Sequence, residues 1–285
     1  MLLTGLHLPM ITPFDESGAV AFAALESLAH RVLGDGATGL VALGTTGEPG
    51  SLTPDERRGV VDLLAAVCHE HGAPLTVGAN TADELRALAG RPAVVAALTL
   101  VPPFLRPGED GVTAHLSALA AVSPVPLIVY HVPYRTAQPL SVRTLTRLAA
   151  VDGIAGVKLA TGAIDADVVA LLAAPPPGFA VLGGDDQLIS PLLALGAHGA
   201  ILASAHLATA DFVALLTAWQ QGDVTRARRS GHRLSQLSAA LFAEPNPAVV
   251  KAVLHAENHI PTPAVRLPLL PAATESTAEV LRLLG

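Results

Sequence analysis

The chain has 285 residues, of which 51% are hydrophobic and 14% are charged, and its formal net charge is −7. This composition excludes a disordered chain, and the acidic balance leaves no basic face for a nucleic-acid backbone, so we expect no nucleic-acid partner. The single cysteine, Cys68, excludes an internal disulfide and a cysteine-based zinc site, which fits a reducing compartment.

Two uncharged stretches test whether the chain enters a membrane. Residues 111–134 and 188–210 contain no Asp, Glu, Lys or Arg, and each is long enough to span a bilayer. Pro, Ser, Gly and His interrupt both, and neither ends in a basic cluster, so we interpret them as buried strand and helix segments. The N-terminal stretch, residues 1–18, has no basic region and no small-residue cleavage site. We therefore expect no membrane association and a cytoplasmic protein.

Short apolar runs rich in Val, Ile and Leu alternate with amphipathic stretches along most of the chain. Eight runs occur, at residues 7–12, 39–43, 74–78, 97–101, 126–130, 154–158, 179–183 and 200–203. The stretches between them include residues 22–34, 53–71, 81–89 and 141–150. Strands that are apolar on both faces and alternate with helices indicate a parallel sheet covered on both sides. Eight such units predict a closed (β/α)8 TIM barrel.

An open, doubly wound α/β sheet is the alternative fold. It would not need eight units, and no GxGxxG phosphate turn follows the first run. The third and seventh predicted helices are short, which is the weakest part of the pattern. Beyond the eighth unit, helical patterns at 223–242, 246–259 and 272–284 continue without strands. We therefore divide the chain into a barrel with the active site, residues 1–222, and a C-terminal helical appendage, residues 223–285.

Active sites of such barrels lie at the carboxyl ends of the strands, so the residue that ends each run is a candidate. Lys158 ends the sixth run, and it is one of two lysines in a chain with fifteen arginines. Unlike arginine, lysine can lose its proton and form an imine, and burial lowers its pKa. We interpret Lys158 as a Schiff-base lysine; a surface lysine at a strand end is the alternative. For Lys251, in the middle of a predicted helix, we expect structural pairing.

Two further strand ends carry three candidate groups, and Tyr130 and Arg135 lie at the same one. The segment Gly44-Thr45-Thr46-Gly47-Glu48 offers hydroxyls and backbone N–H groups to a small carboxylate, or is an ordinary turn. Tyr130 ends the fifth run, where a phenol can relay protons, or is a core tyrosine. Arg135 can hold a substrate carboxylate, or is a surface arginine.

The remaining titratable residues do not form a predicted metal or cofactor site. The histidine pairs 69/71 and 255/259 lack a third ligand at zinc spacing, so we expect structural roles for both. Asp185 and Asp186 follow the seventh run, where a loop or helix-cap role outweighs a metal pair. We expect neither a metal nor a cofactor.

Several motifs together resemble one known family over nearly the whole chain. They are Leu8–Phe14 (LPMITPF), the GTTGE segment, Tyr130–Thr136 (YHVPYRT), Gly156-Val157-Lys158 with Ala160-Thr161-Gly162, Gly184-Asp185-Asp186, Asn246-Pro247 with Lys251, and Arg266–Leu269 (RLPL). On these residues the chain resembles the dihydrodipicolinate synthase / N-acetylneuraminate lyase superfamily of pyruvate-dependent class I aldolases. The synthases are the most similar branch.

The resemblance implies a specific lyase chemistry and a set of site residues. Pyruvate would form a Schiff base with Lys158, and Tyr130 and Thr46 would move the protons. Thr45 and Thr46 would bind the keto-acid carboxylate. It also implies substrate-binding positions at Gly184 and Ile201. The resulting enamine would attack an aldehyde, and most members of the family are homotetramers built from dimers.

The pair Arg135-Thr136 favours the synthase branch, which condenses pyruvate with aspartate semialdehyde in lysine biosynthesis. The resemblance implies that the arginine of this pair binds the carboxylate of aspartate semialdehyde. Phe104 stands where the synthases carry a relay tyrosine that reaches the neighbouring subunit's site, and it has no hydroxyl. His131 and Leu159 also depart from the pattern. They favour the alternative of another pyruvate-dependent aldolase or lyase, acting on a sugar acid or other aldehyde.

Two further expectations follow from the resemblance. The lysine-feedback site of some synthases is only partly matched: Asn80 and Glu84 fit it, whereas Pro49, Pro54 and Pro103 do not. We therefore expect weak or absent inhibition by lysine. A third functional hypothesis is a keto-acid-binding paralogue without activity, against which Lys158, Tyr130 and the GTTGE segment argue.

Overall fold

The computed structural model describes residues 3–91 and 93–285. Eight parallel strands form a closed barrel in chain order, and the last strand pairs with the first. The strands are β1 (Gly5–Pro9), β2 (Gly39–Ala42), β3 (Leu75–Gly78), β4 (Val94–Leu100), β5 (Leu127–His131), β6 (Ile154–Leu159), β7 (Ala180–Gly183) and β8 (Gly199–Ile201). The predicted TIM barrel is confirmed, and each predicted run contributes a strand.

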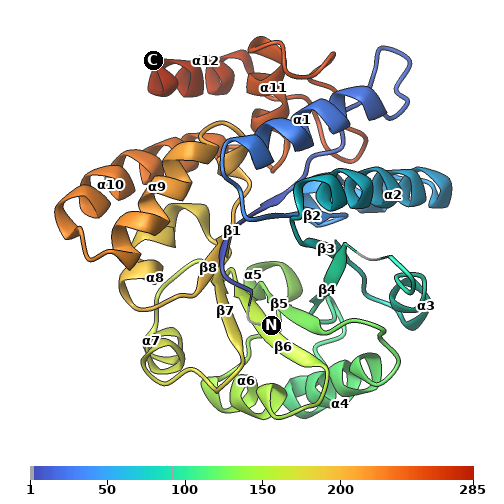
Figure 1. Cartoon of the computed structure of the whole chain (residues 1–285), viewed down its shortest axis with the longest axis vertical. Coiled ribbons are helices and arrows are strands. Elements are labelled where there is room, and N and C mark those ends of the chain that lie inside the picture. Colours follow the sequence, from blue (N-terminus) through green and yellow to red (C-terminus); the bar gives the residue numbers. More distant parts are fainter. Residues whose placement is uncertain (1–2, 92) are drawn as a thin grey trace.

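Helices surround the strands, except for one short helix that lies near the centre of the ring in Figure 1. They are α1 (Phe22–Gly34), α2 (Pro54–His71), α3 (Ala82–Arg86), α4 (Gly108–Ala120), α5 (Pro133–Thr136), α6 (Val142–Ala149), α7 (Ala166–Ala173), α8 (Ile189–Ala194) and α9 (Thr209–Gln220). The expected short third and seventh helices are α3, with five residues, and α8, with six.

The end of the first strand was predicted wrongly. The run 7–12 suggested that Thr12 closes it, but β1 ends at Pro9. The Thr12 hydroxyl donates to the carbonyl of Gly47 at 2.8 Å, and the Thr12 carbonyl accepts a hydrogen bond from Lys251 at 2.9 Å. These groups bond to a loop and to a distant helix instead of a neighbouring strand, which an apolar run cannot reveal.

The core has two layers because successive side chains of a strand point to opposite faces. On β5, Leu127 and Val129 face the helices, whereas Ile128 and Tyr130 belong to a separate cluster inside the barrel. The inner cluster also contains Val41, Leu98, Leu182 and Ile201, from four other strands or strand ends. The barrel is therefore filled with side chains, and its chemistry is confined to the ends of the strands.

Local sequence signals explain where the long second helix begins and ends. The Thr53 hydroxyl accepts a hydrogen bond from the Glu56 N–H, and Glu56 returns one to the Thr53 N–H, which forms a capping box. Gly72 ends the helix with φ of 63°, a left-handed conformation that favours glycine. The same capping box, from Thr81 and Glu84, starts the short α3.

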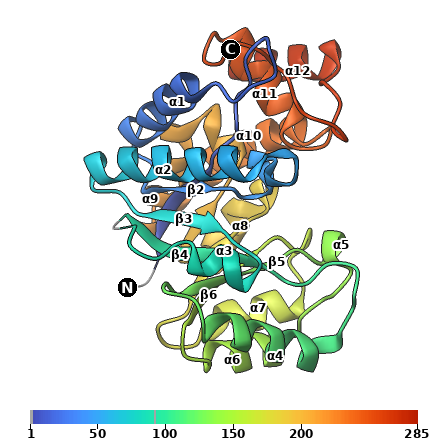
Figure 2. The ribbon, with the colours of Figure 1, turned by 90° about the vertical axis from the view of Figure 1, so that its right-hand side faces the viewer.

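The predicted C-terminal helices are confirmed as α10 (Val224–Leu241), α11 (Ala248–Ala256) and α12 (Thr274–Leu284). Figures 1 and 2 both show α11 and α12 together beside α1, at the opposite end of the molecule from α4 and α6. Residues of α10, α11 and α12 share one hydrophobic core with the barrel helices, among them Leu234, Leu254 and Val280. Among the described residues, no helix has the length and apolar character needed to cross a membrane.

Candidate active site

Lys158 and Tyr130 face each other inside the barrel. They lie on neighbouring strands, β6 and β5, as direct partners in the parallel register. Each side chain is 6% exposed, and the Lys158 ammonium nitrogen lies 4.4 Å from the centre of the Tyr130 ring. The structure thus brings together the predicted nucleophile and the predicted proton carrier, in a place largely closed to water.

Gly184 gives the Lys158 side chain the room it needs. A Cβ atom at this position would lie 2.5 Å from Lys158 Cε and 2.7 Å from Cγ, closer than real Cβ contacts allow. The Gly184 N–H also donates to the carbonyl of Leu159 at 2.6 Å, which holds the β7 loop against β6. Any side chain at residue 184 would displace the lysine, so glycine here follows from the packing.

Two carboxyl groups follow Gly184 and lie near the Lys158 charge. Asp185 accepts a hydrogen bond from the Gly162 N–H at 2.7 Å, and burial raises the pKa of its carboxyl. Asp186 accepts one from the Ser204 N–H at 2.6 Å, and burial raises its pKa to about 6, against the opposing effects of the Ser204 bond and the Lys158 charge. Asp186 therefore joins the β7 and β8 loops, consistent with the predicted loop role.

The segment with Thr45 and Thr46 forms a short 3-10 turn, η1 (Thr45–Gly47), directly after β2. As its first residues, Thr45 and Thr46 have N–H groups without a partner inside the turn. Thr46 is 3% exposed, and its hydroxyl accepts a hydrogen bond from the Asn246 side chain at 2.9 Å. The turn therefore presents backbone donors, as expected of a carboxylate-binding loop.

Glu48, which follows this turn, forms the centre of a buried ionic network. Its carboxylate accepts a hydrogen bond from Lys251 at 2.8 Å and another from the Arg266 N–H at 2.8 Å. The Lys251 ammonium also lies 4.0 Å from the centre of the Phe14 ring. Burial lowers the pKa of Lys251 to about 8, and the Glu48 charge opposes that shift. The predicted structural pairing of Lys251 is confirmed.

The remaining predicted site residues lie at the rim and at one strand end. Ile201 ends β8 and belongs to the inner cluster with Tyr130. Arg135 lies on the exposed single turn α5, with its guanidinium 5.8 Å from the centre of the Tyr134 ring. Phe104, in the loop after β4, is 88% exposed and has φ of 67°.

A cavity of about 230 Å³ opens beside Gly184. Its lining residues are Tyr134, Gly162, Gly184, Asp185, Asp186, Gln187, Leu188 and Phe242. Sequence reasoning missed Phe242, which comes from the C-terminal segment and carries no catalytic pattern. It also gave no role to the Asn246 side chain, although the motif Asn246-Pro247 was noted.

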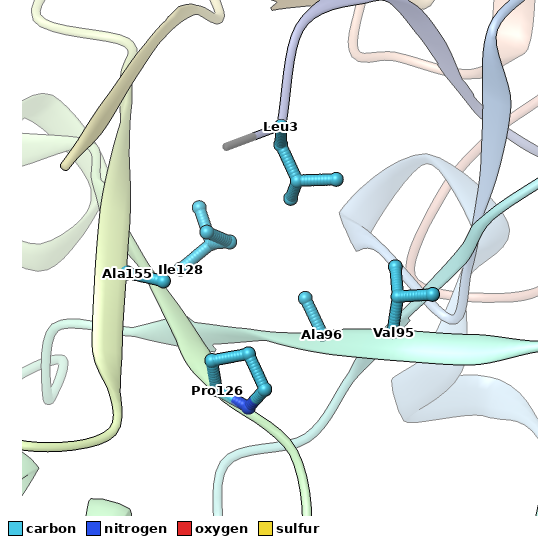
Figure 3. Close-up of a pocket in the computed structure, with 6 residues that line it drawn as sticks. All are labelled: Leu3, Val95, Ala96, Pro126, Ile128 and Ala155. Atoms are coloured by element: carbon cyan, nitrogen blue, oxygen red, sulfur yellow. The ribbon is translucent and has the colours of Figure 1, made fainter. Parts of the chain in front are cut away.

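At the opposite end of the barrel, the described residues that line a pocket are all apolar. A pocket of about 80 Å³ lies there, lined by Leu3, Val95, Ala96, Pro126, Ile128 and Ala155. Figure 3 shows these side chains around a common space, and none of them is titratable. The catalytic candidates therefore gather at one end, the carboxyl end of the strands.

Comparison with known proteins gives a consistent result over the full length. The family model described as the dihydrodipicolinate synthetase family matches residues 2–285. The 4-hydroxy-tetrahydrodipicolinate synthase of Synechococcus elongatus is 38% identical over 275 residues, which cover 93% of this chain and 90% of that protein. The one from Neisseria meningitidis serogroup B is 33% identical, with 98% and 97% covered.

Solved structures with the same fold include two described as dihydrodipicolinate synthases. The structure from Thermotoga maritima has a TM-score of 0.94 at 27% identity, covering all of this chain and 98% of that one. The structure from Bacillus anthracis has a TM-score of 0.93 at 28% identity, with the same coverage. The likeness extends over the C-terminal helices as well as the barrel.

Proposed function

The chain belongs to the dihydrodipicolinate synthetase family, and on that premise we propose that it is a 4-hydroxy-tetrahydrodipicolinate synthase. This enzyme is a Schiff-base-forming lyase that condenses pyruvate with aspartate semialdehyde. The observation that carries the proposal is the buried pair of Lys158 and Tyr130, in register on neighbouring strands with 4.4 Å between ammonium and ring centre.

In the first step the neutral Lys158 amine attacks C2 of pyruvate. The resulting carbinolamine loses its hydroxyl as water, for which a proton must reach that oxygen, and an imine remains. The Tyr130 phenol is suited to deliver the proton because it lies beside the amine and shares its shielding from solvent. Tyr130, having given up its proton, then takes one from the methyl carbon of the imine, which gives the nucleophilic enamine.

The pyruvate carboxylate binds at the turn with Thr45 and Thr46. Unpaired N–H groups at the start of a turn favour an anion, and the buried Thr46 hydroxyl adds a third donor. Thr46 also assists Tyr130 in moving protons. Gly184 and Ile201 complete the pyruvate site through their backbone, next to the lysine and at the end of β8.

The aldehyde enters from the rim, where the enamine carbon attacks its carbonyl carbon; the new carbon–carbon bond forms as the carbonyl π bond breaks and its oxygen takes a proton. The amino group of aspartate semialdehyde then attacks the imine carbon and displaces the Lys158 amine, which closes the product ring and frees the enzyme. Arg135 binds the carboxylate of aspartate semialdehyde. Its exposure at the mouth of the barrel supports this role, because a carboxylate that arrives from solvent can reach the guanidinium.

Turnover with a set of aldehydes tests the function. Purified protein with pyruvate and aspartate semialdehyde should form product faster than with sugar-acid aldehydes or in cleavage of 2-keto-3-deoxy acids. Faster turnover of a sugar acid would instead support a different pyruvate-dependent aldolase, which the missing hydroxyl of Phe104 favours. Arg135→Ala is the matched variant: it should raise KM for aspartate semialdehyde and leave KM for pyruvate nearly unchanged.

We further propose a homodimer or homotetramer in the cytoplasm. Phe104 and Leu105 support an assembly because two adjacent, highly exposed apolar side chains favour burial against another chain. Light scattering during size-exclusion chromatography would measure the mass. Phe104→Ser should shift that mass toward the monomer if the loop forms a contact between subunits.

A further inference from the structure

We infer that Asn246 is a positioning residue for this reaction: its amide N–H holds the Thr46 hydroxyl so that the hydroxyl's own proton points into the active site. The inference rests on the proposed function, because it specifies how one proton donor of that site is aimed. In the proposed mechanism, Asn246 itself contacts neither pyruvate nor the aldehyde.

The contact joins two segments 200 residues apart. Asn246 Nδ2 donates to Thr46 Oγ1 at 2.9 Å. A hydroxyl has one proton and two acceptor sites, and Asn246 fills one of the acceptor sites from outside the barrel. Because an amide N–H₂ cannot accept a hydrogen bond, the Thr46 proton must be directed elsewhere. Thr46 is 3% exposed, so bulk water does not compete for it.

The other end of the Asn246 amide shows that this orientation is unfavourable by itself. Asn246 Oδ1 is buried and has no hydrogen-bond partner among the described residues. An unpaired buried oxygen destabilises a fold, because it has lost its hydrogen bonds to water. The Asn246 amide donates to Thr46 although its own oxygen stays unpaired. We attribute this orientation to the role of the donated hydrogen bond in positioning the Thr46 hydroxyl.

The same C-terminal segment fixes the loop at a second point. Lys251, five residues after Asn246 and on α11, bonds to the Glu48 carboxylate at 2.8 Å and to the Thr12 carbonyl at 2.9 Å. Glu48 has φ of 54° and directly follows the turn with Thr46. Both contacts restrain the loop that carries Thr46, and among the described residues the Asn246 amide is the one hydrogen-bond partner of the Thr46 hydroxyl.

Asn246→Asp separates this role from simple attachment of the C-terminal segment. A carboxylate at this position accepts a hydrogen bond, so Thr46 would donate to it and its proton would leave the site. We expect turnover at pH 8 to fall by about a hundredfold, as for a misaligned catalytic group. At lower pH the protonated carboxyl can donate, so the activity relative to wild type should recover. The Glu48–Lys251 pair is the same in both proteins, so the ratio of variant to wild-type turnover at each pH removes any effect of this pair.

A double-mutant cycle with Thr46→Val provides the second test, and it does not depend on the aspartate variant folding. If Asn246 acts through the Thr46 hydroxyl, Asn246→Ala should lower turnover in the wild-type background and change little in the Thr46→Val background. Asn258→Gly is the control, since Asn258 lies just beyond the other end of α11, at a φ of 62° that suits glycine. Thermal melts of all variants report stability separately.

Three outcomes decide between the possibilities. An Asn246→Asp enzyme with the wild-type pH profile would overturn the inference, as would additive losses in the double-mutant cycle. Borohydride treatment of the wild-type protein with pyruvate distinguishes a failure of the proposed function from a failure of the positioning role of Asn246. If the wild-type protein traps no pyruvate, the proposed function fails. If it traps pyruvate but Asn246→Asp has the wild-type pH profile, or the losses in the double-mutant cycle are additive, only the positioning role of Asn246 fails.

Discussion

The two lysines of the chain are both buried, but their surroundings differ. Lys251 is fully enclosed and bonds directly to the Glu48 carboxylate at 2.8 Å. Lys158 faces the Tyr130 ring, and within residues 3–91 and 93–285 it forms no ion pair. The Glu48 carboxylate holds the proton of Lys251, and the Thr12 carbonyl accepts a second hydrogen bond from the same ammonium. Burial alone therefore does not distinguish Lys158, the proposed nucleophile, from Lys251; the groups around each nitrogen do.

Replacing each lysine by methionine should separate the two roles most strongly. Lys158→Met should reduce turnover to background, since removing a covalent nucleophile has lowered rates on the order of a millionfold in a protease. Its thermal stability should stay the same or rise, because a buried ammonium is replaced by an apolar side chain. Steady-state turnover and a melting curve measure both, and substantial residual turnover would contradict the assignment.

Lys251→Met should instead destabilise the fold. It leaves the Glu48 carboxylate buried without its cation, and removing one partner of a buried pair is unfavourable by about 3–5 kcal/mol. Denaturation with urea measures the free energy of unfolding. The double variant Glu48→Gln with Lys251→Met should recover part of the loss, because the unpaired charge is gone. A Lys251→Met protein as stable as wild type would show that the pair does not support the fold.

Gly184→Ala tests whether Lys158 depends on its close contact with the backbone. The new Cβ would lie 2.5 Å from Lys158 Cε, so the lysine must move. We expect turnover to fall by about a hundredfold, the effect of a displacement near 1 Å. Gly34→Ala, at the end of α1 where a Cβ meets no atom within 4 Å, is the matched control. Equal activity of both variants would contradict the geometry.

Asp186→Asn tests the carboxyl groups that share the surroundings of Lys158 but do not pair with it. Burial raises the Asp186 pKa from 3.8 to about 6, so between these pH values the folded state binds more protons than the unfolded state. Stability therefore falls as pH rises through this window. Asparagine carries no charge, so the variant should be more stable than wild type by about 2–3 kcal/mol at pH 7. At pH 3.5 the difference should vanish, as urea denaturation at both pH values would reveal.

The smallest expected effect is that of added lysine on turnover. Its ammonium groups would need a carboxylate to bind to, as Lys251 binds to Glu48. Asn80, Glu84, Pro49 and Pro54 line one cavity of about 640 Å³ beside α2 and α3. The Glu84 carboxylate is already engaged by Arg57 at 3.2 Å and by the N–H groups of Asn80 and Thr81. We expect added lysine to leave turnover unchanged, and strong inhibition would refute this expectation.

The sequence predicts the barrel and Lys158 because both depend on local signals. Apolar runs mark the strands, and a rare lysine at the end of such a run marks the site. The contact between Asn246 and Thr46 has no local signal, since it depends on how α11 packs against the barrel. Phe242 enters the cavity for the same reason, and Thr12 fell outside β1 because its partners, Gly47 and Lys251, are distant in the chain.

Borohydride trapping with pyruvate, followed by peptide mapping, tests the central claim most directly. The chain offers two lysine amines and its N-terminus, so the site of modification is unambiguous. We predict a reduced pyruvate adduct on the peptide that contains Lys158 and an unmodified Lys251. An adduct on Lys251, or no adduct on folded protein with saturating pyruvate, would contradict the difference between the two lysines.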